Sequence, residues 1–282
     1  FPYTFQYMGL LLLLLKLKKM KIAIHQRNNS FSDRWVKYCE ENNIEYKIVN
    51  AYSNNIKIQI ADCDGFMWHH HHAKPDDVLF AKQLLYSIEH SGTRVFPNFN
   101  TCWHFDDKIG QKYLLEFISA PFVPTYIFYN RTDALKWANS TSFPKVFKLS
   151  KGAGAKNVIL IKTRKHAIYM INKAFKKGFK QSSFKTDIKD RWLRFRNKKK
   201  SILHVFAGFY QIIKPPEFTI KHHNEKNYIY FQDFIINNKF DIRVIVIGNK
   251  AFAIKRLVRK NDFRASGSGN IVYKKEEIDI RC

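Results

Sequence analysis

Apolar and polar positions follow two alternating periods in the first third of the chain. Four short apolar runs predict β-strands at KIAIHQ (21–26), EYKIVNA (45–51), ADCDGFMWHH (61–70) and TRVFPN (93–98). Helical spacing lies between them at 32–42 and 76–91, and the second of these helices ends before Gly92. Strands that alternate with helices predict a small α/β domain with a parallel sheet.

The pattern changes after residue 105. We expect a helix at 106–119, an extended segment at 120–130 and a short helix at 133–139. A strand, a glycine loop and a second strand follow in FPKVFKLSKGAGAKNVILIKT (143–163), and YIYFQDFI (228–235) predicts another strand. The stretch 241–258 predicts a β-hairpin that turns at Gly248 and Asn249.

The first 19 residues, FPYTFQYMGLLLLLLKLKK, fit neither pattern. Their apolar piece, 9–15, is shorter than the roughly 20 residues that span a bilayer, so we expect no integral membrane segment. The basic residues follow the leucines, whereas in a signal peptide they precede them. Met20 opens the first strand, and we expect 1–19 to be an upstream or non-native extension. A short membrane-surface anchor is the alternative.

Charge points to anionic partners. The chain has 282 residues and a formal net charge of +26, from 49 lysines and arginines against 23 acidic residues. A lysine-rich composition typical of an AT-rich genome is the alternative explanation. The segment 173–226 is strongly basic and contains RWLRFRNKKK, in which aromatic residues lie among the cations. This pattern suits RNA or an anionic membrane surface, or else a solvated, lysine-coated lid.

Cysteine and histidine add little chemistry. The four cysteines, Cys39, Cys63, Cys102 and Cys282, have neither metal-site nor disulfide-scaffold spacing, which suits a reducing cytosol and a cytoplasmic protein. The run His69–His72 could bind a metal, but it is also explained as a strand end or a chance cluster. We therefore assign no metal ligand within the chain.

The strand and glycine loop at 145–154 carry the first candidate site. Lys148 lies near the end of the strand and can hold an anion as a point charge. Gly152 and Gly154 allow backbone N–H groups to approach oxygen atoms closely. The loop has no Walker A spacing, and a KGAGA sequence alone is also compatible with a plain hairpin turn.

A second set of candidates lies further along the chain. The strand QDFIINNKFDIR (232–243) can offer backbone groups to an adenine ring, and Asp241 could accept ribose hydroxyls. Arg256 and Arg264, beside the loop NDFRASGSGN (261–270), could hold a phosphoryl group or a carboxylate. For Arg243, an ion pair with Asp241 or Asp262 is the structural alternative.

The order of these pieces resembles one family. FPKVFK, KGAGAKNV, YFQDFI, DIRVIVIG, AIKR and DFRASGSG occur in the order found in the ATP-grasp superfamily, in the branch of RimK-type glutamate ligases and glutathione synthetases. The resemblance covers about 96–269. It implies an α/β (α+β) fold: a pre-ATP-grasp domain at 20–95, then an ATP-grasp domain at 96–282. That second domain would include a lid at about 141–227 and an incomplete C-terminal subdomain.

The resemblance also implies roles for single residues. Lys148 and Lys108 are expected on the nucleotide side, Gly152 and Gly154 in the phosphate loop, and Gln232, Asp233 and Phe234 at the adenine hinge. Asp241 is expected to bind the ribose, and Arg256 and Arg264 to lie near the phosphates and an acyl-phosphate. Family members phosphorylate a carboxylate with ATP and let an amine attack, so ATP, a carboxylate and an amine are the expected partners.

Two departures change this expectation. Ser266 stands where RimK-type ligases carry an Asn, and the family's magnesium ligands are expected beyond Cys282. Glu276, Glu277 and Asp279 lack the strand context of such ligands. We therefore expect an ATP site with impaired turnover, as a truncated gene, a frameshift or a partial sequence would produce. A non-catalytic protein that binds nucleotide or RNA through 173–226 is the alternative function.

Overall fold

The computed structural model describes residues 20–72, 74–152, 157–180, 224–259 and 262–279. It divides the chain into two compact units, Phe1–Phe105 and Asp106–Cys282. Gly154, Cys282, the first 19 residues and most of the basic segment 173–226 lie outside the described residues. Each unit is described by itself.

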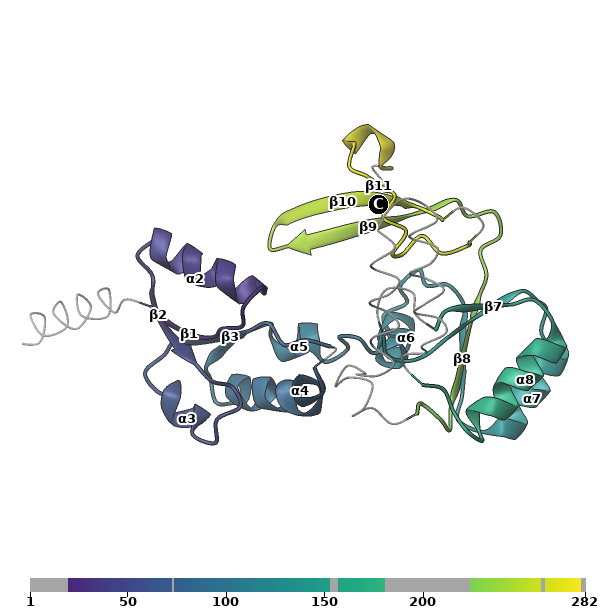
Figure 1. Cartoon of the computed structure of the whole chain (residues 1–282), viewed down its shortest axis with the longest axis horizontal. Coiled ribbons are helices and arrows are strands. Elements are labelled where there is room, and N and C mark those ends of the chain that lie inside the picture. Colours follow the sequence, from purple (N-terminus) through teal and green to yellow (C-terminus); the bar gives the residue numbers. More distant parts are fainter. Residues whose placement is uncertain (1–19, 73, 153–156, 181–223, 260–261, 280–282) are drawn as a thin grey trace, which may run out of the picture. The chain divides into compact units, whose positions relative to one another are not determined.

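Unit 1 contains a four-stranded parallel sheet (Figure 1). Its strands are β1 (Lys21–His25), β2 (Glu45–Val49), β3 (Gly65–Trp68) and β4 (Arg94–Phe96), in the order β2-β1-β3-β4. Its helices are α2 (Phe31–Glu41), α3 (Ile56–Gln59), α4 (Pro75–His90) and α5 (Phe99–Cys102). Helix α2 covers one face of the sheet, and α3 and α4 cover the other. This arrangement follows from right-handed crossovers, because the chain moves from β1 to β2 in one direction and from β2 to β3 in the other.

Local signals in the sequence explain these elements. Ser30 caps α2 in a capping box with Asp33, whose carboxylate accepts the Ser30 N–H. The core contains Phe66 and Trp68 from β3 together with Ala81 and Leu85 from α4, all of them fully or almost fully buried. Cys102 of α5 packs into the same core, so unit 1 extends beyond residue 95, where we placed the domain boundary.

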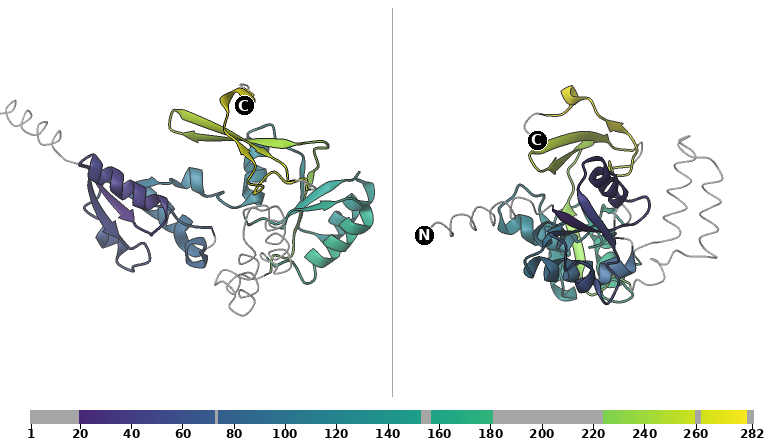
Figure 2. Two further views of the ribbon diagram at one scale, coloured as in Figure 1. Left: turned by 45° about the horizontal axis from the view of Figure 1, so that its top comes forward. Right: turned by 90° about the vertical axis from the view of Figure 1, so that its left-hand side faces the viewer.

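Unit 2 contains a four-stranded antiparallel sheet in the order β5-β8-β6-β7. The strands are β5 (Thr125–Phe128), β6 (Lys145–Lys148), β7 (Ile159–Ile161) and β8 (Ile229–Asp233). Helix α6 (Lys108–Phe117) precedes them, and α7 (Arg131–Ser140) and α8 (Arg164–Ala174) lie side by side against one face (Figure 2). Phe147 and Phe231 point into the core beneath these two helices, and the Trp137 ring stacks on Phe231 with centroids 4.9 Å apart.

A second antiparallel sheet of unit 2 has the order β11-β10-β9. It consists of β9 (Phe240–Ile247), β10 (Lys250–Leu257) and the short β11 (Ile271–Val272), followed by a 3-10 helix, η1 (Lys275–Glu277). Strands β9 and β10 form the predicted hairpin, in which Gly248 has a φ of +58° that suits glycine. Glu276 and Glu277 lie in η1 and not on a strand.

The predicted α/β class is confirmed, and strands or helices occur at every predicted position. The predicted third strand, 61–70, is shorter in the structure because 61–64 form the turn before β3. The sequence analysis missed α8, whose buried positions are Ala167, Met170, Ile171 and Ala174. Among the residues that the structure describes, no helix combines the length and the apolar character needed to cross a membrane.

The central position of Phe231 leads to a stability prediction. Its side chain is fully buried on the middle strand β8, so Phe231→Ala should lower the free energy of unfolding by about 3–5 kcal/mol. Ile236→Ala, at a site 66% exposed, is the control and should change it by less than about 0.5 kcal/mol. Urea unfolding measures both, and equal midpoints for the two variants would contradict this assignment of the core.

Candidate functional site

The candidate site lies on the face of the β5–β8 sheet that α7 and α8 leave uncovered. Side chains alternate between faces along a strand. On β6, Phe147 enters the core and Lys148 therefore points to the opposite face. On β8, Phe231 enters the core and Gln232 points the same way as Lys148. The Lys148 Nζ donates to Gln232 Oε1 at 2.5 Å, which confirms that the two side chains share this face.

Helix α6 brings a second lysine to the end of β6. The Lys108 Nζ donates to the carbonyl oxygens of Ser150, at 3.3 Å, and Gly152, at 2.9 Å. The Lys108 backbone N–H also donates to Ser150 O at 3.0 Å. The positive charge of Lys108 contributes to lowering the pKa of Lys148. The structure thus joins three residues that the sequence analysis selected separately: Lys108, Lys148 and Gly152.

Acidic side chains hold the glycine turn. The Gly152 N–H donates to both carboxylate oxygens of Asp106 at 3.1 Å, and the Ser150 hydroxyl donates to Asp107 at 3.0 Å. Asp107 also caps α6 by accepting the N–H groups of Ile109 and Gly110. Gly152 has a φ of +102° and open space where a Cβ would lie, so backbone conformation is the reason for glycine here. Its N–H already binds an oxygen anion, one supplied by the chain itself.

Glu225 and Tyr228 complete the turn and were missed by the sequence analysis. The Ser150 N–H donates to Glu225 Oε2 at 3.1 Å and to the Tyr228 hydroxyl at 2.7 Å, while the Tyr228 hydroxyl donates to Glu225. Burial, then the charge of Glu225, raises the pKa of Tyr228 well above its ordinary value. These residues lie at the end of a long basic segment, and nothing in their spacing relates Glu225 to a loop 75 residues earlier.

Burial makes the two lysines unusually acidic. Burial, with the charge of Lys108 second, lowers the pKa of Lys148 to about 8. Burial also lowers the pKa of Lys108, against the opposing charges of Asp106, Glu225 and Asp107. A buried cation that is short of counter-charge binds an anion favourably, because the anion restores the interactions that water supplied.

The predicted hinge residues face in different directions. Asp233 lies on the helix-covered side of β8, where it accepts from the buried Lys145 Nζ at 2.5 Å. Its backbone N–H donates to Pro124 O at 2.9 Å. The Phe234 ring contacts Phe263 edge-on, with centroids 5.7 Å apart, which joins the end of β8 to the loop at 261–270. The Lys145–Asp233 pair was not anticipated.

The predicted ribose and phosphoryl residues are engaged in ion pairs. Asp241 and Arg256 lie opposite each other on β9 and β10, and the guanidinium donates to both carboxylate oxygens at 2.6 and 2.7 Å. Asp262 accepts from Arg264 at 2.7 Å. Burial would raise the pKa of Asp262, but hydrogen bonds and charge from Arg264 outweigh it and lower that pKa. Both carboxylates considered for Arg243 are therefore taken by other arginines.

The loop at 262–270 is held by Arg259, which precedes it, and by its own Ser268. Arg259 Nη2 donates to the carbonyl oxygens of Ser266, at 3.3 Å, and Gly267, at 3.0 Å. Ser268 is buried, and its hydroxyl accepts the Asn270 N–H at 3.1 Å. Gly267 and Gly269 both have positive φ, which suits a loop that turns twice within four residues. Arg259 is a further cation at this loop that the sequence analysis missed.

The histidine run of unit 1 is integrated into its packing. His70 is buried, and burial lowers its pKa to about 4. Burial likewise lowers the pKa of His69, whose Nδ1 is 3.4 Å from Arg27 Nη2. Within the described ranges, no group of three or more His, Cys, Asp or Glu side chains is placed to hold a metal ion.

Comparisons with known proteins give distant likenesses. The sequence matches no protein-family model and no curated protein. Solved structures similar to this chain include a RimK domain ATP-grasp protein from Sphaerobacter thermophilus, with 12% identity over 87% of this chain and 74% of that chain, at a TM-score of 0.49. The biotin carboxylase domain of the Hydrogenobacter thermophilus 2-oxoglutarate carboxylase has 13% identity over 86% of this chain and 51% of its own, at 0.48.

A third likeness is to the Staphylococcus aureus N5-carboxyaminoimidazole synthetase complexed with ADP. It has 11% identity over 85% of this chain and 55% of that chain, at a TM-score of 0.48. The chain thus spans about half the length of the second and third of these proteins. Scores and identities at this level do not assign a function to individual residues.

The environment of Lys148 leads to a pH prediction. The folded chain should release the Lys148 proton near pH 8, whereas an unperturbed lysine does so near ~10.4. Below pH 8 the lysine is protonated in both the folded and the unfolded chain, and burial of its charge lowers the free energy of unfolding. Between these two values the unfolded chain binds more protons, so this contribution to stability rises with pH.

NMR of lysine side chains labelled at Cε, assigned with Lys148→Met, measures the midpoint directly. Lys148→Met should also stabilise the fold more at pH 7 than at pH 10. A midpoint above about 10 would show that water reaches the amine.

Proposed function

We propose that unit 2 binds the phosphates of ATP at the Lys108–Lys148 face of its sheet and that the protein is an ATP-dependent carboxylate–amine ligase. The observation that carries the first part is a pair of half-buried lysines: Lys108 donates to carbonyl oxygens of the Gly152 turn, and its charge helps to lower the pKa of Lys148. Two adjacent ammonium groups suit a polyphosphate, whose charge is spread over several oxygens. Gly154, just beyond the described residues, would extend the same loop.

The second part rests on the resemblance of the sequence motifs to ATP-grasp ligases. In the proposed reaction, a carboxylate oxygen attacks the γ-phosphorus of ATP, which releases ADP and forms an acyl-phosphate. The amine nitrogen then attacks the acyl carbon, phosphate leaves, and the nitrogen loses a proton. Gln232, Asp233 and Phe234 would lie at the adenine, Asp241 at the ribose, and Arg256, Arg264 and Ser266 near the acyl-phosphate.

These roles require rearrangement at the second sheet. Arg256 and Arg264 each bind a carboxylate in the structure, so contact with a phosphoryl group would mean sharing or exchanging Asp241 and Asp262. Both arginine side chains are only 15% exposed, and an unpaired charge that is mostly buried is costly, so each arginine would give up its carboxylate favourably only for another anion. This property suits a site that responds to the arrival of phosphate.

Magnesium is the expected partner of ATP in such a reaction, but the described residues do not fit a magnesium site. The carboxylates of Asp233 and Asp241 are bound by Lys145 and Arg256, and no metal-ligand cluster occurs among the described residues. No step of the proposed reaction is therefore assigned to a metal. The roles proposed for the described residues are the binding and positioning of phosphate.

Replacement of Lys148 tests the nucleotide site. Lys148→Ala should weaken ATP binding about tenfold or more, as expected for the loss of one charge-assisted contact. Lys162→Ala removes an exposed lysine after β7 and is the matched control. Isothermal titration with ATP in magnesium buffer gives both affinities, and circular dichroism confirms folding. Unchanged ATP affinity in a folded Lys148→Ala protein would rule out the proposed site.

The same titration distinguishes the proposed ligase from the alternative, a protein that binds RNA. If the basic segment 173–226 binds polyanions, then RNA should bind tightly, with strong salt dependence and no effect of Lys148→Ala. Binding of ATP without binding of RNA favours the ligase.

Replacement of Asp106 tests the charge balance at the glycine turn. Asp106 accepts the Gly152 N–H and places a negative charge beside Lys108. Asp106→Asn retains an acceptor but removes the charge, so ATP should bind a few-fold more tightly, roughly threefold to tenfold. Asp133→Asn, at an exposed position on α7, is the control and should have no effect. Weaker ATP binding by Asp106→Asn would mean that the carboxylate organises the loop and does not compete with phosphate.

A further inference from the structure

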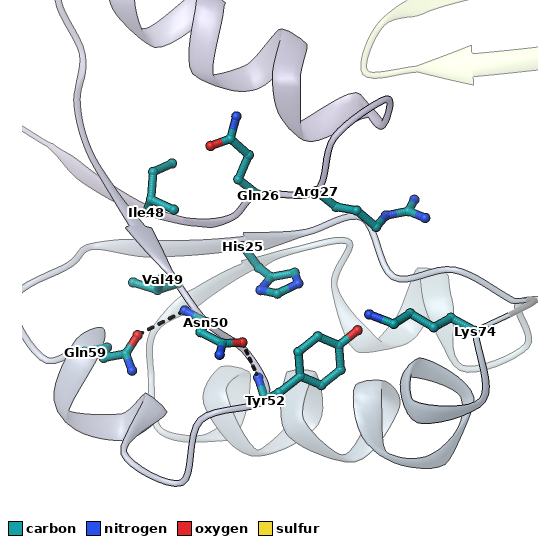
Figure 3. A pocket seen from close by; sticks show the side chains of 9 residues that line it. All are labelled: His25, Gln26, Arg27, Ile48, Val49, Asn50, Tyr52, Gln59 and Lys74. Atoms are coloured by element: carbon teal, nitrogen blue, oxygen red, sulfur yellow. Dashed lines mark hydrogen bonds between the residues drawn. The ribbon is translucent and has the colours of Figure 1, made fainter.

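Unit 1 contains an open pocket of about 570 Å³ that the proposed function does not use. It lies at the carboxyl ends of β1 and β2 and is closed on one side by the chain that enters α4 (Figure 3). Its polar lining includes His25, Arg27, Asn50, Tyr52, Gln59 and Lys74. All of them belong to one compact unit, so the pocket does not depend on how the two units are arranged.

The pocket lies beside the point where the strand order changes direction. In a parallel sheet of order β2-β1-β3-β4, the loops after β1 and β3 lead to helices on opposite faces. They diverge at the carboxyl edge of the sheet, where open α/β sheets bind ligands. Arg27 follows β1, Lys74 follows β3, and the two cations stand on either side of this point.

Within the described ranges, the two cations have no carboxylate partner. Among the residues that the structure describes, neither Arg27 nor Lys74 forms an ion pair. The Arg27 Nε is buried without a hydrogen-bond partner in the described part of the chain, and its Nη2 lies 3.4 Å from His69 Nδ1. The Lys74 Nζ lies 4.2 Å from the centre of the Tyr52 ring. None of the nine lining residues is acidic.

The carboxylate nearest to the pocket wall is already satisfied. Asp77 is buried, and it accepts the Tyr52 hydroxyl and the His71 N–H. Tyr52 therefore directs its hydroxyl to Asp77 and presents its ring to Lys74. The remaining wall has the amides of Asn50 and Gln59, where Gln59 Oε1 accepts the Asn50 N–H at 3.0 Å (Figure 3).

His25 adds a neutral donor or acceptor and no charge. Its Nδ1 accepts the Ala51 N–H at 3.0 Å, which places the proton of the neutral ring on Nε2. Burial lowers the pKa of His25, so the ring is uncharged near neutral pH. The ring meets Tyr52 and Trp68 edge-on, with centroids 5.2 and 5.4 Å away, and is held rigidly at the end of β1.

We propose that this pocket binds a small organic anion whose carboxylate or phosphate group is held between Arg27 and Lys74, with the amides of Asn50 and Gln59 contacting its uncharged part. The planar guanidinium of Arg27 matches either group, since both present paired oxygens. The site is separate from the Lys108–Lys148 face and stands whether or not that face binds ATP.

The test uses the full-length protein and three probes: inorganic phosphate, succinate and, as an uncharged analogue, succinamide. Isothermal titration up to about 10 mM detects affinities near ~1 mM. We expect saturable binding of phosphate or succinate and none of succinamide. The tighter of the two anions distinguishes a phosphate-bearing ligand from a carboxylate-bearing one. Binding of succinamide as tight as that of succinate would overturn the proposal.

Paired variants locate the site. Arg27→Gln with Lys74→Met should weaken anion binding about tenfold or more. Arg34→Gln with Lys57→Met, which removes two exposed cations of unit 1 outside the pocket, should leave it within about twofold, the error of additivity between distant sites. Lys148→Ala is included to detect any anion binding at the Lys108–Lys148 face of unit 2. Loss of binding in Lys148→Ala, with retention in the Arg27/Lys74 variant, would move the anion to unit 2 and overturn the proposal.

A second measurement does not depend on any variant folding. In protein labelled with ¹⁵N-histidine, the anion that binds should shift the ring resonances of His25 with the same saturation curve as the titration heat. The ring of His90, at the end of α4 and outside the pocket, should not move. Saturable binding without any change at His25 would refute this location.

Discussion

The two-residue period of the strands in unit 2 determines which side chains face the candidate site and which enter the core. Strand β8 pairs with β6 so that Lys145 lies opposite Asp233 and Lys148 opposite Tyr230. With this register, Phe231 enters the core beneath α7 and α8, and Lys148 reaches the opposite face. A slip of one residue would exchange the faces and place Lys148 among phenylalanines. The large aromatic core therefore maintains the position of the lysine.

Charge is handled differently in the two units. In unit 2, Lys145, Arg256 and Arg264 each bind a carboxylate, and Lys108 at the glycine turn lies near Asp106, Asp107 and Glu225. In unit 1, Arg27 and Lys74 line a pocket whose nine lining residues include no acid. A net charge of +26 says only that anions are attracted. The local pairing decides where an anion gains most from binding.

Much of the fold could be predicted because its signals are local. Apolar runs identified the strands of the three sheets apart from β11, and Asp107 and Gly248 lie where a helix cap and a hairpin turn require them. Helix α8 was missed since its buried positions Ala167 and Ala174 are small, which weakens the apolar pattern. The role of Glu225 was also hidden, because its partner Ser150 is distant in the chain and only the folded sheet brings them together.

The sequence by itself determined the order of elements, the α/β class of unit 1, the hairpin, and the choice of Lys108, Lys148 and Gly152 as candidates, since each depends on residues close together in the chain. Tertiary structure alone decided that Lys108 binds the Gly152 turn and that Lys148 binds Gln232. It also decided that Asp106 binds the Gly152 N–H and that Arg256 binds Asp241. It also decided that Arg27 and Lys74 line one pocket. Such contacts depend on strand register and on which face a side chain takes, and these are set by packing across the whole sheet.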